Sequence, residues 1–262
     1  MESLPGEYWY ESAGGSTVCG FYLIGLADQV IEIEFLDFDI SCEDGGLLAT
    51  LDGWETRGQI FPSGTDHPLS MVERYKTYCG KNEPSMTFIS SQNVALIQYR
   101  IPNKGQGFRI VVRFIEHHQP CNVVSLEARG TYTLKNFGRK QNCSVSFLYP
   151  ESFSVLALDV GKTGLMSIQN WETGIVAKCA KEGFADYVQF LGGEGLDTSI
   201  MYPAIDVCGL DSNPALPPVM IGCKHSVVRM VSSGNFYNSV NFVFQTFADR
   251  FQRGAFKHCL LD

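Results

Sequence analysis

The stretch that decides the fold is residues 121–150, CNVVSLEARGTYTLKNFGRKQNCSVSFLYP, because part of it occurs twice in the chain. The earlier copy is SLPGEYWYESAGGSTVCGFYLIG at residues 3–25. Four positions match at equal spacing: Gly6, Tyr8, Tyr10 and Cys19 in the first copy correspond to Gly130, Tyr132, Leu134 and Cys143 in the second. A unit repeated within 262 residues predicts two domains, which we place at residues 1–116 and 121–262, with an exposed linker between them.

Short strands separated by turn signals run through both halves, and no long 3.6-residue periodicity occurs. In residues 31–40, apolar side chains alternate with acidic ones, and a phase slip between Phe35 and Leu36 predicts a β-bulge. One helical turn is expected at 71–75. Strands are expected at 87–102 and 107–116 and, where the pattern restarts in the second half, at segments that include 164–171. The fold class predicted is therefore all-β, with two tandem antiparallel β-sandwiches.

Charge and hydropathy exclude two classes of partner. The formal charge is −8 and the longest basic grouping is Arg139-Lys140, whereas nucleic-acid binders carry a basic stripe. No run of eighteen apolar residues exists, so no transmembrane helix is expected. We therefore expect neither a nucleic acid nor a membrane as partner.

The nine cysteines allow two interpretations. They are either reduced thiols of a cytosolic protein or a disulfide framework with one partner missing, and we favour the framework. The first copy of the repeat has no counterpart of Cys121, and the N-terminal residues show no signal peptide. We therefore expect that Met1 is an internal start or the edge of a fragment of a secreted precursor; the alternative is a cytosolic protein with a natural Met1.

Motifs for catalysis or metal binding fail on their spacing. Gly161-Lys162-Thr163 resembles the end of a P-loop, but Leu156 stands where that motif needs glycine, and no GxSxG elbow occurs. His117 and His118 have no third ligand nearby in sequence and suit an exposed linker. We predict no enzyme activity, no cofactor and no metal site.

Trp9 stands out within the first copy. Tyr8 and Tyr10 match Tyr132 and Leu134 of the second copy and take the inward face, so the period-two alternation of a strand turns Trp9 outward. An outward tryptophan is either a contact residue or is covered by a neighbouring segment.

The chain resembles the CUB domain in having a strand led by cysteine, a Cys…Asp-Tyr-Val strand that enters a glycine turn, and a closing pair of strands. Beyond that, it closely resembles the corticotropin-releasing factor-binding protein family of tandem CUB domains. The segments that carry this resemblance are DGW (52–54), FPSGTDHPL (61–69), SSQNVA (90–95), CNVVS (121–125), NCSVSFLYP (142–150), FLGGEGLD (190–197) and IGCKHSVVRMVSSG (221–234). The resemblance implies two CUB-like jelly-roll sandwiches.

The resemblance also implies a set of modified and bonded residues. The disulfides expected are Cys42–Cys79, Cys121–Cys143, Cys179–Cys208 and Cys223–Cys259, with Cys19 unpaired in this chain. Asn142 is the one N-x-[ST] sequon and is predicted to carry a glycan. Some CUB domains hold calcium with three acidic side chains. The first aspartate of that set is kept as Asp186 in the second half but is Gly46 in the first, and the later one is absent from both, where the sequence reads Arg100-Ile101 and Ser232-Ser233-Gly234, so no calcium site is expected.

The function that the resemblance implies is a secreted glycoprotein that sequesters a helix-forming peptide of the corticotropin-releasing factor class, or a related diuretic hormone, and limits its receptor signalling. The residues expected to contact the peptide are Trp9, Trp54 and Arg229, although Trp54 could pack on its own turn and Arg229 could pair within the sheet. Two alternatives stay open: a CUB module of a larger extracellular protease or receptor, and a CUB pair that binds matrix, carbohydrate or another protein.

Overall fold

The structure is a computed structural model that describes residues 1–81, 87–161 and 174–246. The chain divides into two compact units. The first unit comprises Met1–Glu55 and Leu69–Pro120, and the second comprises Thr56–Pro68 and Cys121–Asp262. A short segment from the middle of the N-terminal half, residues 56–68, is thus part of the second unit.

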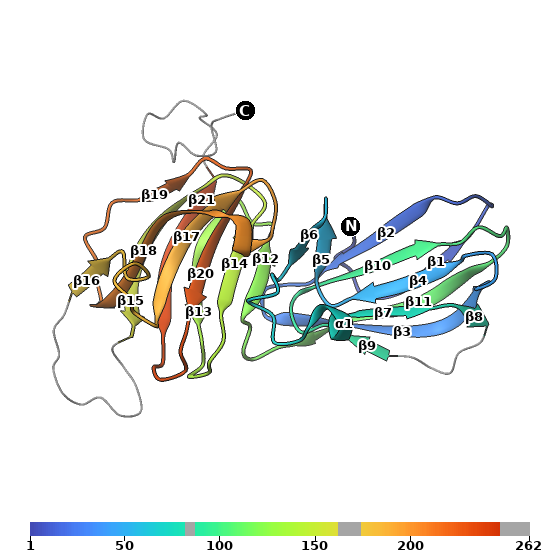
Figure 1. Cartoon of the computed structure of the whole chain (residues 1–262), viewed down its shortest axis with the longest axis horizontal. Coiled ribbons are helices and arrows are strands. Elements are labelled where there is room, and N and C mark those ends of the chain that lie inside the picture. Colours follow the sequence, from blue (N-terminus) through green and yellow to red (C-terminus); the bar gives the residue numbers. More distant parts are fainter. Residues whose placement is uncertain (82–86, 162–173, 247–262) are drawn as a thin grey trace. The chain divides into compact units, whose positions relative to one another are not determined.

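The first unit contains two antiparallel sheets (Figure 1). One has the strand order β1-β11-β3-β8, with β9 also paired to β3, and the other has the order β2-β10-β4-β7. The elements are β1 (Gly6–Glu11), β2 (Val18–Ile24), β3 (Gln29–Ile40), β4 (Leu47–Leu51), α1 (Met71–Arg74), β7 (Tyr75–Tyr78), β8 (Gly80–Lys81), β9 (Thr87–Ile89), β10 (Val94–Arg100) and β11 (Gly107–Glu116). A separate hairpin pairs β5 (Trp54–Thr56) with β6 (Gln59–Phe61).

The core of the first unit lies between its two sheets and is built from alternate residues of the strands. Ile31, Ile33 and Phe35 of β3 are buried, as the alternation predicts. The predicted bulge is confirmed, because the β3–β11 register shifts where Ile110 pairs with Phe35 and Arg109 pairs with Asp37. The skipped residue, Leu36, is exposed. The bulge lets β3 keep its apolar side chains inward on both sides of the slip.

One expected strand of the first unit proves to be two. The segment predicted as a single strand at 87–102 forms β9 and β10, which belong to different sheets. Between them Ser90 accepts the Ile31 N–H at 2.8 Å and donates to the Gln92 carbonyl at 2.6 Å. These side-chain bonds replace ladder bonds and turn the chain from one sheet to the other. The predicted helical turn at 71–75 is confirmed as α1.

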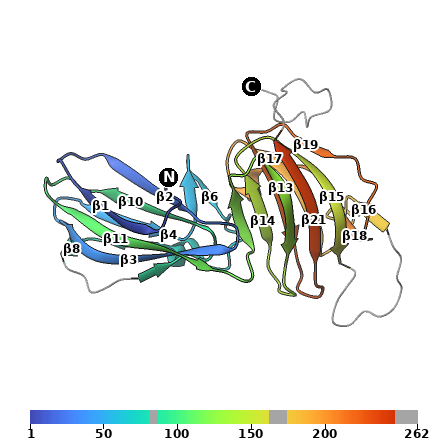
Figure 2. The same ribbon diagram turned by 180° about the vertical axis from the view of Figure 1, so that it is seen from behind.

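The second unit is one continuous sheet folded into a sandwich, with the order β12-β14-β20-β17-β18-β15-β21-β13. The reverse view shows β13, β21 and β15 side by side (Figure 2). β12 is parallel to β14, and β16 and β19 pair with β18 and β15. The elements are β12 (Asn122–Ser125), β13 (Arg129–Lys135), β14 (Cys143–Phe147), β15 (Glu151–Val160), β16 (Gly174–Ala177), β17 (Tyr187–Gly193), η1 (Thr198–Ile200), β18 (Tyr202–Asp211), β19 (Val219–Ile221), β20 (His225–Val231) and β21 (Ser239–Thr246). The strand expected at 164–171 lies outside the described residues.

The sequence repeat is a repeat of strand pairing. The first copy supplies β1, which pairs with β11, and β2, which pairs with β10. The second copy supplies β13, which pairs with β21, and β14, which pairs with β20. Each half therefore places its copy of the repeat against its own closing strands. The all-β class predicted from the sequence is confirmed.

A titratable side chain lies in the core of the second unit. Glu151, on β15, is fully buried, and Thr246 donates a hydrogen bond of 2.7 Å to its Oε1. Its Oε2 has no hydrogen-bond partner among the described residues. Burial raises the pKa of Glu151 from its ordinary value near 4.5 to about 7, and the bond from Thr246 offsets only part of that rise.

We predict a pH-dependent stability that depends on Glu151. Because its pKa is higher in the folded protein than in the unfolded chain, the stabilisation is complete below about pH 4.5 and is lost as the pH rises to about 7. Glu151→Gln stays neutral throughout, so its free energy of unfolding relative to wild type should rise by up to about 3 kcal/mol between pH 4.5 and 7.5. Urea denaturation at several pH values measures this. Glu127→Gln, at an exposed position, is the control, and a pH-independent difference for Glu151→Gln would contradict the prediction.

Candidate functional site

Trp9 lies on the outward face of the edge strand β1, as its alternation with Tyr8 and Tyr10 predicts. Its side chain is 74% exposed, whereas Tyr8 packs on Phe21 and Tyr10 packs on Tyr99, with ring centroids 5.2 and 4.6 Å apart. β1 is the last strand of its sheet, so Trp9 has a paired strand on one side only. A large aromatic surface is therefore available at the edge of the first unit.

Trp9 borders an open hollow of about 630 Å³ on this sheet face. The hollow is lined in part by Gly107, which pairs with Glu11 of β1 and with Asp39 of β3. Carboxylates outnumber cations around it, with Lys81 held by Asp39 at 3.2 Å. This surface combines an aromatic ring with an acidic rim.

Trp54 is in a different position from Trp9. Its side chain is 3% exposed, and its indole N–H lies 3.0 and 3.1 Å from the carbonyl oxygens of Leu23 and Ala95. Tyr22 packs edge-on against its ring at 5.8 Å. Trp54 thus packs on residues distant in sequence and not on its own turn, and its burial does not favour a role in peptide contact.

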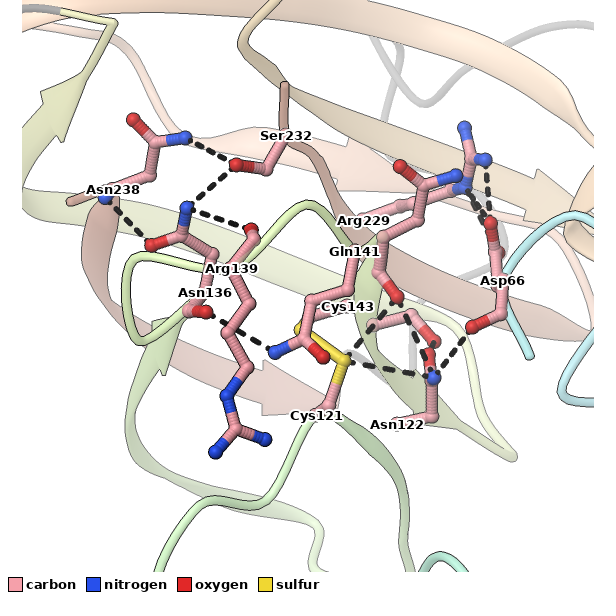
Figure 3. Close-up of a disulfide and its surroundings, with 12 residues drawn as sticks. Asp66, Cys121, Asn122, Asn136, Arg139, Gln141, Cys143, Arg229, Ser232 and Asn238 are labelled. Carbon is pink, nitrogen blue, oxygen red and sulfur yellow. Dashed lines mark hydrogen bonds and ion pairs between the residues drawn. A yellow bond between two sulfur atoms is a disulfide. The ribbon is translucent and has the colours of Figure 1, made fainter. Parts of the chain in front are cut away.

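Arg229 is likewise engaged within the protein (Figure 3). Its guanidinium makes a two-pronged contact with Asp66, with Nε at 2.9 Å from Oδ2 and Nη2 at 2.5 Å from Oδ1. The two side chains are 13% and 1% exposed. Nη1 donates to Gln189 at 2.9 Å. The alternative stated for Arg229, pairing within the sheet, describes its bond to Gln189 of β17, whereas its ion-pair partner Asp66 lies in the loop after β6.

The strands of the second unit present Arg229 within a row of polar residues. Asn122 of β12, Ser144 of β14, Arg229 of β20 and Gln189 of β17 are neighbours in register across four adjacent strands. The segment 56–68 lies on this row. Asn122 donates to the Asp66 carbonyl at 3.1 Å, and its Oδ1 accepts a bond from Ser144 at 2.9 Å. The polar row is therefore covered and satisfied by residues of the N-terminal half.

Further contacts fix the same segment. The Thr198 hydroxyl donates to Asp66 Oδ2 at 2.5 Å, and Asn142 donates to the Thr65 carbonyl at 3.0 Å. Gln59 packs so closely over Gly195 that a Cβ there would lie 1.9 Å from the Gln59 carboxamide oxygen. A side chain at position 195 would therefore displace the Gln59 carboxamide from its present place.

These contacts determine the pKa of Asp66 in its pair with Arg229. Burial alone would raise the pKa of Asp66, but hydrogen bonds and charge from Arg229, with bonds from Thr198 and Asn142, outweigh it and hold the pKa below its ordinary value. The carboxylate is thus charged at neutral pH. Sequence reasoning selected Arg229 but missed Asp66, Asn122 and Gln189. Gln189 and Arg229 interrupt the apolar runs of β17 and β20, which was a usable signal, whereas Asn122 begins β12 and Asp66 lies in a loop, where no strand pattern marks them.

Family models match nearly the whole chain. The model described as "Corticotropin-releasing factor binding protein N-terminal domain" matches residues 1–116, and the corresponding C-terminal domain model matches residues 123–251. The chain belongs to the corticotropin-releasing factor-binding protein family. This confirms the resemblance found in the sequence.

Individual relatives agree with this assignment. The chain is 37% identical over 242 residues to corticotropin-releasing factor-binding protein of Xenopus laevis, with 92% of this chain and 73% of the relative covered. It is 35% identical over 245 residues to the human protein, with 94% and 74% covered. Both relatives carry a name for binding, not for catalysis.

Solved structures of CUB domains also match, but with poor superposition. The "CUB1-EGF-CUB2 domain" of human MASP-1/3 has a TM-score of 0.29 at 10% identity, covering 92% of this chain and 99% of that one. The extracellular region of zebrafish Gpr126/Adgrg6 has a TM-score of 0.31 at 12% identity, covering 92% and 36%. The family assignment therefore depends on the sequence matches.

The structure contains three disulfides of the set that the resemblance to the corticotropin-releasing factor-binding protein family implied. They are Cys42–Cys79, Cys121–Cys143 and Cys179–Cys208, with Cα atoms 5.2, 4.5 and 6.1 Å apart. Cys19 is free, and Cys223 is buried, with its predicted partner Cys259 outside the described residues. Disulfides are typical of oxidising compartments, and with the family membership they indicate an extracellular protein.

Asp186, the possible calcium ligand of the family comparison, is buried and bonded to neutral groups. Its Oδ1 accepts bonds from the Ser232 hydroxyl, the Ser233 N–H and the Asn238 amide at 3.1, 3.0 and 2.7 Å. Among residues 1–81, 87–161 and 174–246, no three His, Cys, Asp or Glu side chains group closely enough to hold a metal ion. In the same part of the chain, no helix is long and apolar enough to span a membrane.

We predict that removal of one partner of the Asp66–Arg229 pair strongly destabilises the protein. Asp66→Ala leaves a guanidinium buried without its partner, which should lower the free energy of unfolding by about 3–5 kcal/mol. Asp39→Ala, which breaks the exposed contact with Lys81, should lower it by less than about 1 kcal/mol. Urea denaturation of both variants measures this, and equal effects would contradict the prediction.

We predict that Asn142 carries a glycan in the secreted product. Its Nδ2 lies at an exposed contact with Thr65 and keeps one N–H after glycosylation, so one of its two bonds, to the Thr65 carbonyl or to Asp66, can persist. The neighbouring Cys143 lowers occupancy if its disulfide forms first. Mass loss on glycosidase treatment that disappears in Asn142→Gln supports the site. An unchanged mass of the wild-type protein would refute it.

Proposed function

We propose that this protein is secreted and captures a peptide hormone of the corticotropin-releasing factor class, reversibly and without chemistry on it, so that less hormone reaches its receptor. The observation that carries the proposal is the family match over residues 1–116 and 123–251. The two domains of the proposal are residues 1–116 and 121–262, with residues 56–68 packed on the second unit. A diuretic hormone of the same peptide class fits the proposal equally.

The contact surface that we propose is the outward face around Trp9. Hormones of this class form amphipathic helices, and such a helix binds by burying an apolar stripe against aromatic or aliphatic anchors. Trp9 supplies such an anchor, and the hollow beside it leaves room for side chains of the peptide. Trp54 and Arg229, whose polar groups are bonded within the protein, support the fold in this proposal.

The proposal is tested by titrating the full-length secreted protein with a synthetic corticotropin-releasing factor peptide in a calorimeter. Competition with a receptor requires nanomolar affinity, about 12 kcal/mol, so we expect a Kd near that value. A Kd weaker than about 10 μM, where only about 7 kcal/mol is available, would rule the capture function out.

The anchor role of Trp9 gives a separate prediction. Trp9→Ala removes an exposed ring without disturbing the core, and loss of a binding anchor of about 2 kcal/mol should raise the Kd about 30-fold. Phe184→Ala, at an aromatic side chain of the second unit that is 49% exposed, is the matched control and should leave the Kd unchanged. If both variants still bind the peptide tightly, the anchor role of Trp9 is disproved, while the capture function is not.

A further inference from the structure

The segment that packs on the second unit is the tip of a loop whose base is closed in the first unit. The Asp52 N–H donates to the Arg74 carbonyl, and Arg74 Nε donates to the Asp52 carbonyl, both at 3.0 Å. The Asp52 carboxylate accepts bonds from the Ser91 N–H at 2.7 Å and from the Gln92 amide at 2.7 Å. Both residues of this neck are buried, Arg74 to 1% exposure. The loop thus leaves and re-enters the first unit at one rigid place.

The tip of the loop is held on the second unit by buried contacts. Phe61 is fully buried, and Asp66 is held by Arg229, Thr198 and Asn122. Within the tip, the N–H groups of Asp66 and His67 both donate to the Ser63 carbonyl. The outer face of β12, β14, β20 and β17 is therefore a docking surface for a segment with a buried carboxylate, and residues 56–68 occupy it.

The linker between the halves is open by comparison. His118 and Gln119 are exposed and lie outside any strand, between Glu116 at the end of β11 and Cys121. Exposed polar connections of this kind are the preferred sites of proteolytic nicking. Each of the three disulfides in the described part of the chain joins two cysteines of the same half.

We propose that the two halves are held together by this docked loop independently of the linker, so that a chain cut between His118 and Gln119 stays one complex. The polar row of the second unit binds residues 56–68 of the N-terminal half. It also binds them when the N-terminal half is a separate chain. A further consequence, which rests on the proposed function, is that a nicked molecule in extracellular fluid still captures its peptide.

The test is a full-length protein with a protease recognition sequence inserted between His118 and Gln119. After complete cleavage, a denaturing, non-reducing gel must show two fragments, which excludes a disulfide between them. Size-exclusion chromatography without denaturant should then give one peak that contains both fragments, at the elution volume of the uncut protein. Two peaks, or loss of the C-terminal fragment by aggregation, would overturn the proposal.

Two variants test whether the docked loop, and not another contact, holds the cut fragments together. Asp66→Ala should raise the dissociation constant of the cut fragments about 100-fold or more, as expected for a broken buried pair. Asp39→Ala, which disturbs an exposed pair of the first unit, should leave it unchanged. Circular dichroism of each uncut variant verifies that it is folded, and the milder Asp66→Asn replaces Asp66→Ala if that variant is not.

Refolding of the C-terminal fragment is a second test of the same proposal. The isolated C-terminal fragment, purified in urea and diluted, should refold fully only when the N-terminal fragment is added. A C-terminal fragment that folds alone with the Tm of the cut complex would show that residues 56–68 are dispensable for the second unit, and the proposal would fall. Peptide titration of the cut protein is scored separately, so failure of the capture function leaves the association result intact.

Discussion

The second unit depends on the buried contact between Asp66 and Arg229. The side chains of Asp66 and Arg229 are 1% and 13% exposed, and removal of either would leave the other buried without its opposite charge. Because Asp66 comes from the N-terminal half, this contact obliges residues 56–68 to stay on the second unit. The neck at Asp52 and Arg74 then anchors both ends of that loop in the first unit.

The segments that carry the family resemblance converge on this loop. Asp66, Asn122 and Arg229 lie in three of them. The blocks at 142–150 and 190–197 supply Asn142, Gly195 and Asp197, which contact the tip, and Ser144, which bonds to Asn122. The remaining blocks, at 52–54 and 90–95, form the neck around Asp52. The sequence signature therefore marks the loop that connects the halves, whereas the exposed Trp9 lies outside it.

Strand periodicity made much of the fold predictable from the sequence. The bulge at Leu36 and the outward side chain of Trp9 follow from period-two alternation, which depends on neighbouring residues alone. The burial of Trp54 and Arg229 was not predictable in this way, since it is produced by Leu23, Ala95 and Asp66, which are distant in sequence. Local patterns give the face of a strand and do not give what covers that face.

The measurement that tests this account most directly is amide hydrogen exchange of the intact protein at neutral pH. If residues 56–68 are part of the second unit, the amides of Asp66 and His67 should be protected as strongly as those of β14 and β20, and Asp66→Ala should remove that protection. Exchange of these two amides at the rate of an open loop, while β14 and β20 remain protected, would contradict the account.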